Sequence, residues 1–169
     1  SAIKLEGGAI MADRVRTIAR AGIPVMGHIG LTPQSVHQFG GYKVQGKNYL
    51  DSRKIKQDAS DLQSAGIFAL VLEGIPSELG EEITSELKIP TIGIGAGAKC
   101  DGQILVLHDL LGLNQDFVPK FVKQYAQMAD NLKVAVTEFI EEVKTESFPS
   151  QEHIYHSKQG RLKQVNDGN

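Results

Sequence analysis

Short apolar runs alternate along the chain with longer amphipathic stretches, and glycine stands in most of the connections. An apolar run without internal alternation is typical of a strand buried on both faces of a parallel sheet. Apolar residues that recur every three or four positions predict helices. The predicted strands are 2–6, 24–28, 68–73, 90–95 and 103–107. The predicted helices are 10–20, 52–65, 76–88, 119–128 and 131–145.

This alternation predicts repeated strand–helix–strand units and a parallel α/β fold. Composition does not separate a doubly wound sheet from a barrel. Polar groups at the ends of three consecutive strands favour the barrel, whose strand ends all face one mouth. Five units are too few to close a (β/α)8 barrel, so we expect three units to be missing or to belong to another chain. The first predicted strand begins almost at Ser1, as if the sequence were cut inside an element.

The composition is that of an ordinary soluble globular protein, with 169 residues, 41% hydrophobic, 22% charged and a formal net charge of -2. This charge offers no electrostatic footprint for nucleic acid or an anionic membrane. A single cysteine, Cys100, excludes an internal disulfide and a thiolate metal cluster, and suits a reducing compartment. No membrane span or secretion signal is visible. We expect residues 1–150 to form part of one barrel and 151–169 to form a mobile tail.

Charged residues stand where the predicted strands end, just before glycine. Lys4 and Glu6 end the first strand and lie two residues apart, so both side chains point to the same face. Lysine can neutralise a substrate carboxylate, and glutamate can hold a metal ion or its water. A purely structural Lys–Glu pair at the barrel floor is an equally good interpretation of these two residues taken alone.

Glu73 is the strongest single candidate, because it follows the apolar run 70–72 and precedes Gly74. A partly desolvated carboxylate in this position is suited to removing a proton beside a carbonyl. The alternative, a cap on the next helix, is less good because that helix starts only after Pro76. His28 could orient a substrate oxygen or shuttle a proton, but a hydrogen-bonded core histidine is the favoured interpretation.

Two glycine-rich segments carry weaker signals. Residues 93–97 have the spacing G-x-G-x-G, which does not match the dinucleotide fingerprint, so the glycines predict only a close approach of the backbone to a ligand. The polar insertion 39–47 follows a strand end and is either an active-site lid or a surface loop. Its position over the expected mouth favours the lid.

Several blocks of sequence together resemble the ketopantoate hydroxymethyltransferase family. They occur in order along the chain, up to about His156, and the long blocks around His28 and Tyr42 are the most specific. The blocks are 3–8, 27–35, 40–46, 72–76, 92–97 and 101–109.

The resemblance implies a (β/α)8 TIM barrel of the phosphoenolpyruvate/pyruvate type, of which this chain holds about five βα units. It implies hydroxymethyl transfer from 5,10-methylenetetrahydrofolate to 3-methyl-2-oxobutanoate, giving 2-dehydropantoate for pantothenate biosynthesis. A divalent metal, usually Mg²⁺, would stabilise the enolate. By resemblance Glu73 is the proton acceptor, Lys4 contacts the keto acid and Glu6 belongs to the metal site. The family's enzymes are cytoplasmic homo-oligomers, commonly decamers.

One departure from the family is large. Its members carry a further βα portion ahead of the residue matching Lys4, including aspartates that hold the metal and the keto acid. We therefore expect this chain alone to bind metal poorly and to be inactive. Two other interpretations stay open: a lyase of the same superfamily that cleaves a C–C bond in a 2-oxo acid, and a non-catalytic fragment that supplies strands to a second chain.

Overall fold

Five parallel strands form one sheet, and their order across the sheet is their order along the chain. The computed structural model describes residues 1–32 and 43–156. Its strands are β1 (Ile3–Glu6), β2 (Val25–Gly30), β3 (Ala69–Glu73), β4 (Thr91–Ile94) and β5 (Gly102–Gln103). The predicted parallel α/β fold is therefore confirmed.

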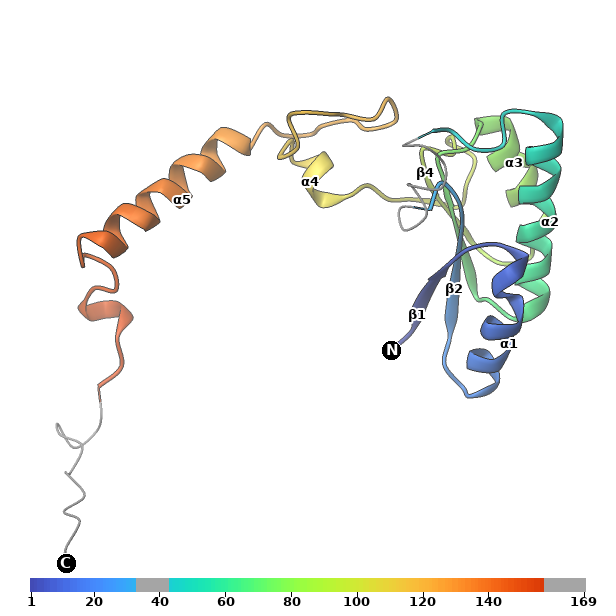
Figure 1. Cartoon of the computed structure of the whole chain (residues 1–169), viewed down its shortest axis with the longest axis horizontal. Helices are drawn as coiled ribbons and strands as arrows, with labels where there is room; N and C mark the ends of the chain where they lie inside the picture. Colours follow the sequence, from blue (N-terminus) through green and yellow to red (C-terminus); the bar gives the residue numbers. More distant parts are fainter. Residues whose placement is uncertain (33–42, 157–169) are drawn as a thin grey trace, which may run out of the picture.

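The helices that connect the strands lie together on one face of the sheet (Figure 1). They are α1 (Ala12–Arg20), preceded by the short 3-10 helix η1 (Ala9–Met11), then α2 (Tyr49–Ala65) and α3 (Ser77–Glu86). A doubly wound sheet carries helices on both faces and reverses its strand order. The described part of this chain does neither.

The core fills the layer between the sheet and these helices. The largest fully buried apolar side chains come from both layers: Leu62, Leu70, Leu72, Ile83, Val15 and Val25. The helix predicted over 10–20 forms from Ala12; Val15 is fully buried on it, whereas Ile10 is 83% exposed. Ile10 lies in η1, where the backbone is wound differently from α1, so the spacing counted along the sequence does not carry it to the core.

Helix α2 shows how local signals fix the ends of an element. It begins at Tyr49, three residues before the predicted start, because the Asn48 side chain accepts a hydrogen bond from the backbone N–H of Asp51 at 2.9 Å. It ends as predicted at Ala65, and the next residue, Gly66, has a φ of 102°, a left-handed value that suits glycine. The capped helix places Ile55, Ala59 and Leu62 against the sheet.

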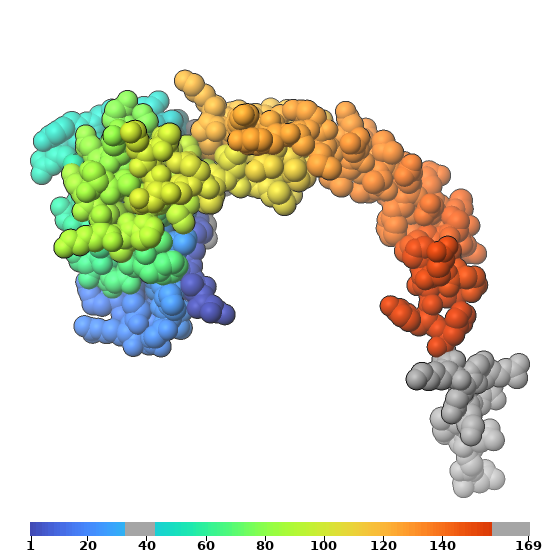
Figure 2. Space-filling view, turned by 180° about the vertical axis from the view of Figure 1, so that it is seen from behind, coloured from blue at the N-terminus to red at the C-terminus, as the bar shows by residue number. Residues whose placement is uncertain are grey.

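The second half of the described chain leads away from the sheet as an arm (Figures 1 and 2). It contains α4 (Leu107–Leu110), α5 (Ala129–Lys144) and the 3-10 helix η3 (Gln151–His153). Neither α4 nor α5 has a buried residue. Among the described helices, none is both long and apolar enough to cross a membrane.

In this half one predicted strand is shorter than expected and one predicted helix is wrong. The strand predicted at 103–107 ends at Gln103: the N–H of Ile104 makes one more bond, to Gly93 O, before α4 begins at Leu107. The helix predicted at 119–128 does not form. Its backbone is hydrogen-bonded elsewhere, since the N–H of Tyr125 donates to Leu110 O and that of Met128 to Leu111 O.

Two further predictions fall partly outside the described residues. The lid prediction covers 39–47, of which 39–42 are not described, and the tail prediction covers 151–169, of which 157–169 are not described.

Candidate functional site

The predicted site residues lie on the face of the sheet that the helices leave uncovered. In the register of the sheet, Glu6 pairs with His28 on β2, and Glu73 on β3 pairs with Gly30, two residues after His28. Side chains two residues apart on a strand share a face. Lys4, Glu6, His28 and Glu73 therefore point to the same side, at the carboxyl ends of β1, β2 and β3.

Contacts link these four side chains into one cluster. Lys4 Nζ lies 3.0 Å from Glu6 Oε1 and also 3.0 Å from His28 Nδ1. On the other side of the ring, His28 Nε2 lies 3.0 Å from Glu73 Oε2. A longer approach of 3.5 Å joins His28 Nδ1 to Glu6 Oε1. The sequence suggested that Lys4, Glu6 and Glu73 meet at one rim, and the structure brings them together through His28.

His28 is the centre of this cluster, with its side chain only 4% exposed. A lysine ammonium can only donate, so Nδ1 accepts from Lys4 and the neutral ring carries its hydrogen on Nε2. Nε2 is close to Glu73, yet its N–H is not aligned on the carboxylate, and within the described residues it has no hydrogen-bond partner. A buried donor that is poorly satisfied costs free energy, and such groups often mark a ligand site.

The sequence alone favours a core role for His28, whereas the structure places it between Lys4 and Glu73. One signal in the sequence could have pointed to a site role for His28. Like Glu73, it lies near a glycine at the end of a strand. The contact itself depends on the pairing of β2 with β3, which joins residues far apart along the chain.

The strand ends are held close by glycine. Gly30 has a φ of 94°, and a Cβ there would collide with the carbonyl oxygen of Glu73. That same oxygen accepts a hydrogen bond of 2.8 Å from the N–H of Leu31. Glycine at position 30 therefore lets the end of β2 turn tightly against the end of β3 and fixes the backbone of Glu73.

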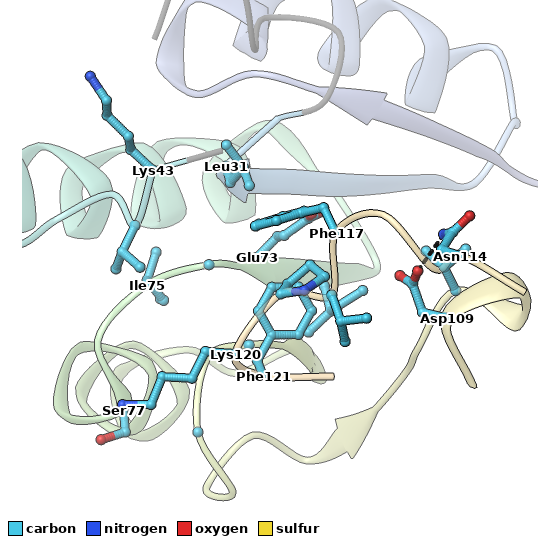
Figure 3. Close-up of a pocket in the computed structure, with 18 residues that line it drawn as sticks. Leu31, Lys43, Glu73, Ile75, Ser77, Asp109, Asn114, Phe117, Lys120 and Phe121 are labelled. Carbon is cyan, nitrogen blue, oxygen red and sulfur yellow. Dashed lines mark hydrogen bonds between the residues drawn. The ribbon is translucent and has the colours of Figure 1, made fainter. Parts of the chain in front are cut away.

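A cavity of about 1180 Å³ adjoins the cluster (Figure 3). Of the four cluster residues, only Glu73 lines it, so this carboxylate forms the boundary between cluster and cavity. The other walls come from the ends of β2 and β4, the start of α3, and the segment that follows α4. Its side-chain walls include Leu31, Lys43, Val44, Ile75, Ser77, Ile94, Val106, Asp109, Asn114, Phe117, Val118, Pro119, Lys120 and Phe121.

The glycine block 93–97 shapes this cavity by admitting protein side chains. At Gly95, with φ 65°, a Cβ would lie 2.6 Å from Cδ1 of Phe121. At Gly97, with φ 85°, a Cβ would lie 2.6 Å from Cβ of Ser77. The close approach predicted for these glycines is thus occupied by Phe121 and by the first residue of α3.

Two shifted pKa values mark contacts between neighbouring elements of the fold. Hydrogen bonds from the N–H and hydroxyl of Thr91, at 2.8 and 3.1 Å, lower the pKa of Asp101 and tie the loop after β4 to the start of that strand. Side-chain hydrogen bonds to Glu86 and Glu82 raise the pKa of Lys56. Both are structural contacts between neighbouring elements.

The described residues do not form a complete metal site. Among them, no group of three or more His, Cys, Asp or Glu side chains is placed to hold an ion. Mg²⁺ prefers about six oxygen ligands in octahedral geometry, whereas Glu6 is already paired with the Lys4 ammonium.

A profile of ketopantoate hydroxymethyltransferases matches residues 1–151. The chain belongs to this family. The resemblance found in the sequence is therefore confirmed, and it extends over both the sheet and the arm.

Individual relatives agree with the ketopantoate hydroxymethyltransferase profile, and each is a 3-methyl-2-oxobutanoate hydroxymethyltransferase. The protein from Anaeromyxobacter dehalogenans is 56% identical over 161 residues, which cover 95% of this chain and 53% of the relative. That from Syntrophus aciditrophicus is 54% identical, covering 91% of this chain and 57% of the relative. That from Clostridium acetobutylicum is 50% identical, covering 98% and 60%. The chain thus spans little more than half the length of these relatives.

Proposed function

We propose that this chain forms part of an enzyme that transfers a hydroxymethyl group from 5,10-methylenetetrahydrofolate to 3-methyl-2-oxobutanoate, giving 2-dehydropantoate. The observation that carries the proposal is that His28 contacts both Glu73 and Lys4, at the ends of three neighbouring parallel strands. Membership of the ketopantoate hydroxymethyltransferase family supports the choice of substrates.

We also propose that the five strands are part of a (β/α)8 barrel of the phosphoenolpyruvate/pyruvate type. The consecutive strand order and the helices on a single face are what a segment of barrel wall would show. In such a barrel the uncovered face of the sheet points inward, and catalytic groups lie at the carboxyl ends of the strands. The cluster has this position.

In the proposed reaction each cluster residue has one task. Lys4 binds the carboxylate of the keto acid and offsets the negative charge of the enolate. Glu73 removes the proton from C3, and the electrons of that C–H bond enter the enolate. Water adds to the methylene carbon of the folate and both of its C–N bonds break, which releases tetrahydrofolate and leaves the carbon as formaldehyde. C3 of the enolate then bonds to this carbon, and the former carbonyl oxygen takes up a proton to become the hydroxyl of the product. His28 positions Lys4 on one side and Glu73 on the other.

Glu6 is the proposed ligand for Mg²⁺, because its carboxylate shares a face with Lys4 and Glu73. When bound, the ion would polarise the keto acid. The described residues supply too few oxygen ligands to hold it, so the steps above rest on Lys4, His28 and Glu73.

We propose, in line with the family, that the enzyme works in the cytoplasm as a homo-oligomer, with further polypeptide packed against this chain. Within the described residues, β1 and β5 are edge strands. Several apolar side chains of α5 are about half exposed, among them Leu132, Val136 and Phe139. Edges and apolar faces of this kind support docking, either by the remaining length of the family's chain or by another subunit.

The test joins the N-terminal portion of the Anaeromyxobacter dehalogenans relative to residue 1, and compares this chimera with the 169-residue chain. Both receive 3-methyl-2-oxobutanoate, Mg²⁺ and 5,10-methylenetetrahydrofolate labelled with ¹³C at the methylene carbon. We expect labelled 2-dehydropantoate, measured by mass spectrometry, from the chimera and none from the chain alone. A chimera that cleaves the keto acid, or forms no labelled product, would contradict the proposal.

A further inference from the structure

The cavity beside Glu73 is larger than a short-chain keto acid needs. Its volume is about 1180 Å³, whereas pockets for drug-sized ligands usually measure about 300–1,000 Å³. The keto acid is also expected on the Lys4 side of Glu73, and Lys4 does not line the cavity. The space is therefore available for a second and larger molecule.

The cavity walls suit a flat ring. Phe117 and Phe121 both face the cavity in Figure 3, with Val118 and Val44 completing an apolar lining. Aromatic rings attract other rings by stacking or edge contacts. Phe121 is held against the backbone at Gly95, where there is no room for a side chain, so one aromatic wall is fixed before any ligand binds.

The polar groups of the cavity favour a ligand that carries both N–H donors and negative charge. Asp109 Oδ1 accepts a hydrogen bond of 2.6 Å from Asn114 Nδ2, which orients the carboxylate. A carboxylate has several further lone pairs and can accept two neighbouring N–H groups from one ligand edge. Lys43 and Lys120, both exposed, also line this cavity, and the Lys43 side chain extends outward from it (Figure 3). A ligand with N–H donors on a ring and carboxylates on a tail would match both.

We propose that this cavity binds the folate co-substrate. The pterin ring lies against Phe117 and Phe121, its amino-pyrimidinone edge donates to Asp109, and the glutamate tail extends toward Lys43 and Lys120. Glu73 stands on the wall shared with the cluster, so the donor's methylene carbon and the enolate meet there. This assignment rests on the proposed function and adds the residues that hold the one-carbon donor.

The test titrates the 169-residue chain with 5-formyltetrahydrofolate, a stable analogue of the co-substrate, and measures the dissociation constant by calorimetry. We expect Phe121→Ala and Asp109→Asn each to weaken binding about tenfold. The double variant Lys43→Gln/Lys120→Gln should weaken binding of this analogue several-fold but leave binding of pteroate, which lacks the tail glutamate, unchanged. Phe139→Ala, a half-exposed phenylalanine on α5, serves as the matched control and should bind normally.

Circular dichroism checks that each variant is folded. If Phe121→Ala does not fold, the Asp109 and lysine variants still test the proposal. Absence of binding by the unmodified chain would overturn the proposal, and so would equal affinities of all variants. Product formation by the chimera, together with unchanged folate affinity in the variants, would refute the cavity assignment alone. The expected affinities, with no product from the chimera, would refute the proposed function alone.

Discussion

Replacing Glu73 by glutamine removes the proposed base while nearly preserving the shape of the side chain. The Glu73 side chain is 13% exposed, and its Oε2 lies 3.0 Å from His28 Nε2. The glutamine side chain has nearly the same size and can place its oxygen beside this nitrogen as Glu73 does, so the packing at the end of β3 should be kept. What is lost is the ability to take a proton from carbon.

The expected effect follows from that single loss. General acid–base groups contribute about 10²–10⁴-fold to rate. At about 1.36 kcal/mol for each factor of ten, the barrier to proton removal should rise by about 2.7–5.4 kcal/mol. Binding of the keto acid should change little, because the proposed contact to its carboxylate comes from Lys4.

The assay isolates this step by leaving out the folate. The chimera is placed in D₂O with 3-methyl-2-oxobutanoate and Mg²⁺, and proton NMR follows replacement of the C3 hydrogen by deuterium. Glu86→Gln is the matched control, since Glu86 is 56% exposed and pairs with Lys56 away from the cluster. If Glu73→Gln exchanged deuterium as fast as Glu86→Gln, Glu73 could not be the base.

Three further predictions concern stability, each measured by urea unfolding of the 169-residue chain. Leu72→Ala should lower the free energy of unfolding by about 2–5 kcal/mol, because Leu72 is fully buried in the core. Gly30→Ala should cost more than about 1–2 kcal/mol, the usual penalty for a left-handed non-glycine residue, because its Cβ also collides with the carbonyl of Glu73; an unchanged stability would exclude the tight turn. Asp101→Asn should lower the free energy of unfolding at neutral pH. The difference in this free energy between the variant and the unmodified chain should shrink as the pH falls below the ordinary pKa of aspartate, about 3.9. The reason is that the lowered pKa of Asp101 stabilises the folded state only where the carboxylate is ionised. A difference that stayed constant with pH would contradict this last reasoning.

The sheet half of the fold could be predicted from local patterns. Strands β2 to β4 are mainly apolar runs, whereas β1 alternates apolar and charged residues. Glycine after α2 gives the end of that helix a local cause. The arm could not be predicted in the same way. The spacing of residues 119–128 is compatible with a helix, but their N–H groups find carbonyls at Leu110 and Leu111 instead, a choice made by tertiary contacts rather than by spacing.

The candidate site divides in the same manner. Lys4, Glu6 and Glu73 stand out because a charge at the end of a buried run is expensive without partners. The role of His28 depends on two pairings between strands, and only the assembled sheet shows that its two ring nitrogens face Lys4 and Glu73. The proposed role of Asp109 likewise could not be predicted from the sequence, because it depends on the cavity that the folded chain forms around this residue.

Helix α5 has 16 residues and none of them is buried. Isolated helices shorter than about 12–15 residues are marginal in water, and longer ones in proteins owe most of their stability to packing. In the 169-residue chain, amide protons of α5 should therefore exchange with solvent far sooner than those of α2, and heating should unwind the arm well before the sheet melts. Two separate steps in helical signal would be the visible result, one for each half of the molecule.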